Sequence, residues 1–258
     1  MSFYSIIILF SGIFGLALGS FVNVCIYRIP LTKSIVSPPS SCPNCKRRIR
    51  FYDNIPLLSY IILLGKCRYC RHPISWQYPA VEALIGLLSL ILFIRYGISY
   101  QYILFLLFIT SLVTISFIDF HHQIIPDSIS LPGIISGLTV SIFLGHISWQ
   151  DSLIGIIAGG GSLYLVAFIY EHITGKEGMG GGDIKLLAMI GAWMGWRALP
   201  LIVMISSLTG VLIGYTFILL TRKGFRARIP FGPFLSFGAI TYFFFGYQLT
   251  RWYYRFLL

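Results

Sequence analysis

Two aspartates stand at the edges of apolar segments and are the residues best placed to do chemistry. The chain has only eight acidic residues in 258, so the position of each one is informative. Asp119 ends the run "TISFID", and Asp183 follows the glycines of "GMGGGD" and precedes the apolar run "IKLLAMIGAWMGW". Two carboxyl groups in a partly dry site cannot both ionise easily, so together they can activate water as a base and protonate a leaving amine. The pair therefore predicts aspartic-protease chemistry, with a titration that belongs to both residues.

The glycines before Asp183 are candidate substrate-binding residues: Gly178, Gly180, Gly181 and Gly182. Glycine adopts backbone conformations closed to other residues and lets a substrate strand approach the backbone closely. The alternative is a flexible loop in which Asp183 caps the following helix, since aspartate is favoured at that position. The two interpretations are compatible, because a capping aspartate can also catalyse.

Other polar residues near these motifs have competing interpretations. Asp119, His121 and His122 could ligate a metal, although their spacing enforces no coordination geometry, and histidines at a headgroup boundary are more often simply interfacial. Asp127 follows Pro126 and precedes an apolar segment, which fits a helix cap.

Glu82, in "YPAVEALIG", lies one turn inside an apolar segment. An acid at that place is a candidate for the substrate site, or for pairing with a basic residue of the preceding loop. Lys185 can pair with an aspartate or extend its ammonium group to the membrane surface.

Four of the five cysteines form two C-x2-C pairs, "CPNC" (Cys42, Cys45) and "CRYC" (Cys67, Cys70), separated by 21 residues. Two such pairs can present four thiolates tetrahedrally, as structural zinc prefers, and the flanking Lys and Arg residues would stabilise the thiolates. The alternative is free thiols or two disulfides, which a reducing cytoplasmic loop disfavours. A closed four-cysteine site has no open coordination position, so we expect its metal to fold the loop. Cys25 lies in an apolar run and is most simply a packing residue.

The composition is that of a polytopic membrane protein. Hydrophobic residues make up 57% of the chain and charged residues 10%, whereas soluble domains average roughly 25% charged residues. Apolar runs of about 20 residues predict membrane-spanning helices. The first run has no positive leader and no cleavage site, so we expect it to be retained. We predict eight spans: Ser5–Tyr27, Pro79–Ile94, Tyr102–Phe120, Ser128–Leu144, Ser152–Tyr170, Ile184–Trp196, Leu199–Thr221 and Phe234–Leu249.

The basic residues predict the orientation of these spans. With the N-terminus outside, 15 of the 19 Lys and Arg residues fall in the cytoplasmic segments 28–78, 121–127, 171–185 and 222–233. Positive charge accumulates on the cytoplasmic side of membranes, and both aspartates then lie at that boundary. We expect no nucleic-acid binding, because the basic clusters lack interleaved aromatic platforms.

Five segments together resemble the type IV prepilin peptidases, also called prepilin leader peptidase/N-methyltransferases. The segments are "GSFVNVCIYRIP", the cysteine loop with "DNIPLLSY" and Glu82, "FIDFHHQIIPDSISLP", "GMGGGDIKLLAMIGAWMGW" and "IPFGPFLSFGAI". The resemblance, which runs nearly from end to end, implies a GxGD-type intramembrane aspartic protease with the catalytic pair Asp119 and Asp183. Many relatives carry an acid at the position of His121, which leaves Asp119 as the only acid at the end of its span here.

The resemblance also implies a substrate, a second reaction and a methyl donor. The substrate would be a type IV prepilin or pseudopilin, cut on the cytoplasmic side after the glycine that ends its short basic leader. Family members with the cysteine loop usually also methylate the new N-terminal amine with S-adenosylmethionine. The motifs assign no residue to that cofactor beyond the loop, with Glu82 as a candidate for its support.

We therefore expect an all-α polytopic protein of the cytoplasmic (inner) membrane, with about eight transmembrane helices and a cytoplasmic four-cysteine zinc-binding loop. Its predicted parts are a first span (1–31), the cytoplasmic loop (32–78) and a transmembrane aspartic peptidase core (79–258), and the protein is expected to be embedded in the lipid bilayer. A transporter with an aspartate relay is an alternative that requires carboxylates near mid-membrane. A non-catalytic scaffold that docks partners through the zinc loop leaves Asp119 and Asp183 without a role.

Overall fold

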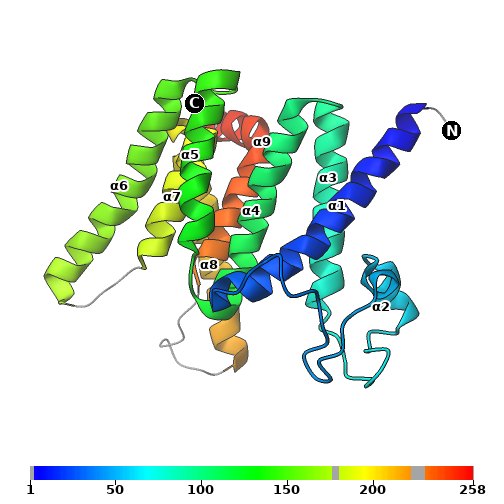
Figure 1. The fold of residues 1–258 in the computed structure, drawn as a ribbon. Coiled ribbons are helices and arrows are strands. Elements are labelled where there is room, and N and C mark those ends of the chain that lie inside the picture. The colour runs from blue at the N-terminus through cyan, green and yellow to red at the C-terminus, as the bar shows by residue number, and fades with distance from the viewer. Residues whose placement is uncertain (1–2, 176–179, 222–229, 258) are drawn as a thin grey trace. The chain divides into compact units, whose positions relative to one another are not determined.

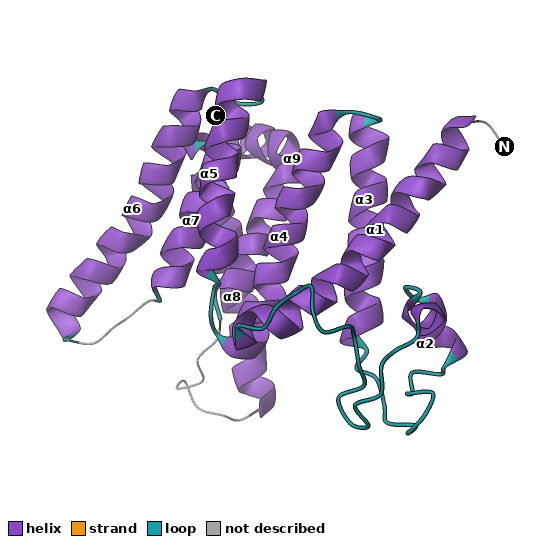
Figure 2. Ribbon diagram, viewed as in Figure 1, coloured by secondary structure: helices purple, strands orange, loops and turns teal. Residues whose placement is uncertain are grey.

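The described part of the protein is helical. The structure is a computed structural model that describes residues 3–175, 180–221 and 230–257, and within these residues there are helices and loops but no β-strand (Figure 2). The helices cluster into two compact units, Met1–Thr110 and Ser111–Leu258. Helix α4 (Tyr100–His122) begins in the first unit and ends in the second.

Each predicted span falls on one helix, except that the sixth, Ile184–Trp196, runs two residues beyond the helix end at Met194. In the described part of the chain, the helices that match the predicted spans are α1 (Phe3–Arg28), α3 (Gln77–Tyr96), α4, α5 (Asp127–Leu144), α6 (Trp149–Thr174), α7 (Gly181–Met194), α8 (Leu199–Thr221) and α9 (Gly232–Leu257). Six of them, α1, α3, α4, α5, α6 and α8, are long and apolar enough to cross a membrane. Helix α7 has 14 residues, about 21 Å at 1.5 Å per residue, which is shorter than the hydrocarbon core of about 30 Å. A polytopic α-helical fold is confirmed, and the count of eight spans stays a prediction.

In the first unit, α1 crosses α3 (Figure 1), and small residues lie where the two helices meet. A Cβ at Gly15 would lie 2.4 Å from Ser89 Cβ, so the helix backbones approach more closely than larger side chains would allow. The Ser89 hydroxyl donates to the Ser11 carbonyl oxygen over 2.7 Å and also lies 2.7 Å from the Tyr102 hydroxyl. This contact joins α1, α3 and the first turn of α4.

The loop between α1 and α3 carries the four paired cysteines and three short helices. These are η1 (Ile29–Leu31), η2 (Phe51–Asn54) and α2 (Leu58–Ile62). Two isolated bridges, Ser41 with Arg48 and Lys66 with Pro73, close the two cysteine turns.

In the second unit, α7 is the central helix. Its residues from Leu186 to Trp193 are all buried, and α5 and α6 pack against it. A helix that is apolar on every side is expected to be enclosed by its neighbours. The α6–α7 crossing is close, since a Cβ at Gly155 would lie 2.3 Å from the Gly191 carbonyl oxygen. The Trp193 indole N–H donates to the Gly133 carbonyl oxygen of α5 over 2.8 Å, which fixes the rotation of α7. Through η3 (Trp196–Ala198), α7 leads into α8, which packs on α9.

Candidate active site and metal centre

Asp119 lies one turn before the end of α4. The helix ends at His122 because Gln123 takes a left-handed conformation (φ 54°) and Pro126 disfavours helix in the residue before it. The Asp119 side chain is buried within the second unit. Its Oδ2 accepts a hydrogen bond of 3.0 Å from the backbone N–H of Gly232, the first residue of α9.

Gly232 is a site residue to which the sequence analysis assigned no role. A Cβ at this position would lie 2.6 Å from Asp119 Oδ2 and 3.2 Å from Ile125 Cδ1, so only glycine fits beside the carboxylate without a shift. The sequence feature that could have indicated this role is the segment "PFGPF", in which a glycine followed by a proline stands at the start of a helix.

Asp183 is the third residue of α7 and does not cap it. Gly180 occupies the N-cap, and the backbone N–H of Asp183 donates to the Gly180 carbonyl oxygen over 3.2 Å. The capping interpretation is therefore wrong, because Gly180 is the N-cap and no side chain makes a capping hydrogen bond there. Asp183 Oδ1 is buried and accepts no hydrogen bond within the described chain.

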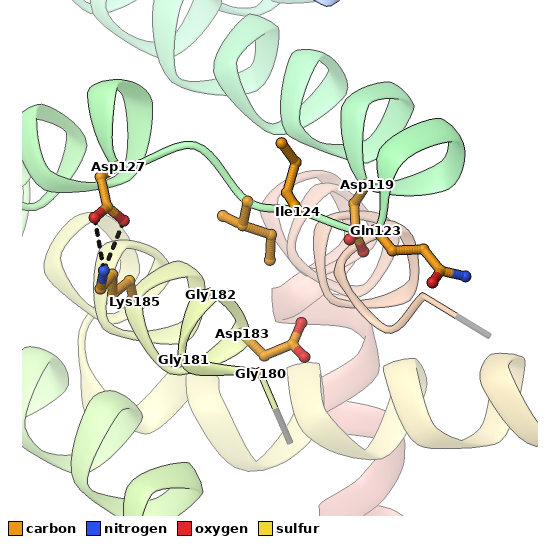
Figure 3. Close-up of a pocket in the computed structure, with 10 residues that line it drawn as sticks. Asp119, Gln123, Ile124, Asp127, Gly180, Gly181, Gly182, Asp183 and Lys185 are labelled. Atoms are coloured by element: carbon orange, nitrogen blue, oxygen red, sulfur yellow. Dashed lines mark hydrogen bonds and ion pairs between the residues drawn. The ribbon is translucent and has the colours of Figure 1, made fainter. Parts of the chain in front are cut away.

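The two aspartates line one open pocket of 370 Å³. Figure 3 shows the Asp119 carboxyl group coming from α4 and the Asp183 carboxyl group from α7, both at the same part of the pocket. The two groups are close enough to interact electrostatically. The pocket is lined by Asp119, Gln123, Ile124, Ile125, Asp127, Gly180, Gly181, Gly182, Asp183 and Lys185.

Three of the four predicted glycines border this pocket. A Cβ at Gly182 would lie 2.8 Å from Ile125 Cβ, so glycine permits the loop after α4 to lie against α7. Gly180 and Gly181 line the pocket, and a Cβ at either would meet no described atom within 4 Å. Gly178 lies outside the described residues. The role of these glycines in substrate binding stays a prediction.

The third acid of the pocket has a cation partner. Lys185 Nζ lies 2.7 Å from Asp127 Oδ1 and 2.8 Å from Oδ2, so the predicted pairing of Lys185 with an aspartate is confirmed. Asp127 is the first residue of α5 and Pro126 is its N-cap, so a capping role for Asp127 is wrong. Neither Asp119 nor Asp183 belongs to an ion pair in the described segments. The pocket therefore contains one neutralised carboxylate and two without a charged partner.

Glu82 belongs to the first unit and is held by a backbone group. It is 8% exposed, and its Oε2 accepts a hydrogen bond of 2.9 Å from the N–H of Leu57 in the cysteine loop. This partner is a main-chain amide and not the basic side chain that the sequence suggested. The assignment of Glu82 to the substrate site stays a prediction.

The four paired cysteines form a cluster that can hold a metal ion. Their sulfur atoms all lie within 4.8 Å of one another, and the Sγ atoms of Cys42 and Cys70 are 3.7 Å apart. Tetrahedral zinc with Zn–S bonds of about 2.3 Å requires sulfur atoms about 3.8 Å apart, so the cluster fits such an ion. All four thiols are free of disulfides. Among the described residues no second cluster of three or more possible ligands occurs, so His121 and His122 do not form a metal site with Asp119.

The two cysteine turns are built alike. The N–H of Lys46 donates to the Cys42 carbonyl oxygen (2.9 Å) and that of Arg71 to the Cys67 carbonyl oxygen (3.0 Å). Lys46 and Arg71 both have φ 58°, which turns the chain back after each cysteine pair. This equivalence indicates two halves of one coordination site.

An ion pair connects η2 to the second cysteine turn. Arg68 Nε lies 3.0 Å from Asp53 Oδ1 and 2.9 Å from Oδ2. The hydrogen bonds from this guanidinium hold the pKa of the Asp53 carboxyl group below its usual range. The loop is therefore ordered by side-chain contacts around the cysteine cluster.

Comparison with known proteins identifies the family. Residues 13–96 match the model of the bacterial peptidase A24 N-terminal domain, and residues 106–215 match that of the type IV leader peptidase family. Proteins named prepilin leader peptidase/N-methyltransferase from Stutzerimonas stutzeri and Aeromonas hydrophila are 38% and 37% identical over 267 and 275 residues. These alignments cover 95% and 97% of this chain, and 92% and 93% of the relatives.

A protein of the same name from Legionella pneumophila is 35% identical over 265 residues, which cover 94% of this chain and 92% of the relative. No solved structure matches the chain. The matches to both domain models and to full-length relatives, together with the paired aspartates and the cysteine cluster, show that this chain belongs to the type IV leader peptidase family.

Proposed function

We propose that this chain is a membrane-embedded aspartic endopeptidase that cleaves the basic leader of type IV prepilins or pseudopilins after a glycine. The proposal places the protein in the cytoplasmic (inner) membrane with its N-terminus outside and the aspartates facing the cytoplasm, as the basic residues favour. Membership of the leader peptidase family and relatives named prepilin leader peptidases support the substrate class.

The observation that carries the catalytic assignment is the charge pattern of the pocket. Asp119 and Asp183 come from different helices to one pocket, while Lys185 neutralises the third acid, Asp127. Two uncompensated carboxyl groups in a partly dry site favour a shared proton. This is the protonation state that general acid–base hydrolysis by two aspartates requires.

The proposed reaction proceeds by attack of water on the peptide carbonyl carbon. The carboxylate of the pair takes a proton from the water as its oxygen bonds to that carbon, and the carboxylic acid of the pair donates a proton to the departing nitrogen. The C–N bond then breaks to leave a carboxyl group on the leader and an amine on the mature pilin. The N–H of Gly232 holds the Asp119 carboxylate in place, and the open backbone at Gly180 and Gly181 gives the substrate strand access.

The proposal includes a structural zinc ion and a second activity. Cys42, Cys45, Cys67 and Cys70 would hold zinc, which would order the loop between α1 and α3. The new N-terminal amine would then be methylated with S-adenosylmethionine as the donor, in line with the names of the relatives.

Cleavage of a co-expressed prepilin in membranes tests the peptidase assignment. Asp119→Asn and Asp183→Asn each keep the side-chain shape but remove the acid–base function, so both should abolish processing while the protein still accumulates in the membrane. Asp127→Asn is the matched control and should retain processing. Normal processing by either of the first two variants would refute the assignment, and Asp127 and Glu82 would then be the next candidates for the catalytic acids. The mass of the mature pilin N-terminus reports methylation separately.

A further inference from the structure

A short segment of the cysteine loop exposes an unusual amount of apolar surface. It comprises α2 with its flanking residues, 57–64, of sequence "LLSYIILL". The side chains that carry this surface are Leu58 (57% exposed), Ile61 (66%), Ile62 (72%) and Leu64 (83%). Single exposed apolar residues are normal on a protein surface, whereas a contiguous exposed apolar patch indicates an interaction site.

One face of this segment is already occupied by the loop itself. The Tyr60 hydroxyl donates to the Ile74 carbonyl oxygen over 3.4 Å, and Tyr60 lies against Gly65. The side chains of Tyr60 and Ser59 are only partly exposed. The segment therefore has a side that packs on the second cysteine turn and an outer side formed by Ile61, Ile62 and Leu64. This outer side is the surface that lacks a partner within the described chain.

The anchoring hydrogen bond sets the depth of this outer side. Leu57 N–H donates to Glu82 Oε2, and Glu82 lies five residues after Gln77, the first residue of α3. Five residues correspond to about 7.5 Å along an α-helix. The start of α2 is thus bonded to a group inside the span, and Figure 1 shows α2 beside the lower part of α3. The segment therefore begins beside the first two turns of a membrane-spanning helix.

The residues around the start of α3 mark a membrane–water boundary at the same level. Trp76 and Tyr78 are 73% and 43% exposed, and these two residue types are enriched where lipid headgroups begin. Exposed Lys66 and Arg71 belong to the adjacent cysteine turn. Basic side chains beside an apolar face complement the anionic headgroups of a cytoplasmic leaflet.

We propose that residues 57–64 form an interfacial anchor that inserts the side chains of Ile61, Ile62 and Leu64 between the lipids of the cytoplasmic leaflet. The partner is a bilayer that contains anionic headgroups, with its acyl chains against the apolar face and its headgroups against Lys66 and Arg71. This anchor holds the four-cysteine turns at the membrane surface, so the loop is not a polar domain that projects freely into the cytoplasm. The proposal goes beyond the peptidase activity, and its choice of the cytoplasmic leaflet rests on the orientation given with the proposed function.

Photocrosslinking in the full-length chain tests the anchor. A benzophenone amino acid would replace Ile62, whose exposure leaves room for the larger side chain without disturbing the fold. The purified protein would be placed in nanodiscs of phosphatidylethanolamine and phosphatidylglycerol, illuminated, and digested for mass spectrometry. The same probe at Phe10 in α1, 63% exposed, gives the yield of lipid adducts on a membrane-spanning helix. The probe at Arg48, exposed on the first cysteine turn, gives the yield on the loop surface.

We expect lipid adducts at Ile62 with a yield comparable to that at Phe10 and several-fold above that at Arg48. A second probe at Ile61 should give the same result, since its side chain is on the same outer surface. Adducts to another part of this chain or to a second copy would overturn the proposal and identify a protein contact. A yield at Ile62 no higher than at Arg48 would overturn it as well, because the segment would then face water.

Discussion

Replacement of Gly232 by alanine should disable the site without removing either aspartate. The added Cβ would lie 2.6 Å from Asp119 Oδ2, whereas ordinary contacts begin at 3.4 Å. The carboxylate must therefore move by about 0.8 Å, and a misplacement of about 1 Å can cost about 100-fold in rate. The same shift weakens the hydrogen bond of 3.0 Å from the Gly232 N–H, and a hydrogen bond to a charged group contributes about 1.5–3 kcal/mol. We expect cleavage to fall about 100-fold.

The assay is the initial rate of prepilin cleavage by purified protein in lipid vesicles, normalised to the amount of folded protein. Gly238→Ala is the matched control, because Gly238 lies on the same helix as Gly232. Its added Cβ would meet Ser206 Oγ of α8 at 2.4 Å and would not touch Asp119. Such overpacking costs about 1–3 kcal/mol of stability, so the control measures loss of folded protein alone. If Gly232→Ala cleaves at the wild-type rate per folded molecule, the inferred role of Gly232 is wrong. Equal losses in both variants would assign the effect to packing.

Three further perturbations test other parts of the structure. Cys67→Ser removes one of four thiolates, so bound zinc measured by elemental analysis should fall from about one ion per chain to a small fraction of that. Cys25→Ser should leave the zinc content unchanged, and equal zinc in both variants would contradict the four-cysteine site. Lys185→Met leaves the exposed Asp127 carboxylate without its partner, so cleavage should slow through added negative charge, although stability should change by less than about 1 kcal/mol. Adding Asp127→Asn should restore the rate, and failure of this rescue would show that charge is not the cause. Glu82→Ala removes the acceptor of the Leu57 N–H, so amide hydrogen exchange around α2 should accelerate. Glu82→Gln keeps an acceptor oxygen and should retain protection from exchange, and equal exchange in the two variants would argue against the hydrogen bond from Leu57 to Glu82.

Local features of the sequence were sufficient to predict the helices and the metal cluster. Each apolar run became one helix, because a long apolar segment in a membrane must satisfy its backbone hydrogen bonds within itself. The spacing within each cysteine pair brings two sulfur atoms together on one turn, so the composition of the cluster followed from the motif. The count of eight spans stays a prediction, since α7 has 14 residues, fewer than a lipid-exposed span needs, and is enclosed by other helices.

The sequence by itself identified Asp119 and Asp183 as site candidates, because acids are rare in this chain and stand out at the edges of apolar runs. Only the tertiary structure decided how the other groups are used. It placed the Gly232 amide on a carboxylate 113 residues away, paired Lys185 with Asp127 rather than with a member of the candidate pair, and tied Glu82 to the backbone of the cysteine loop. These partners come from helices and loops distant in sequence, and their meeting depends on how helices cross at small residues. The spacing of residues along the sequence does not specify these contacts, because they depend on how the helices pack.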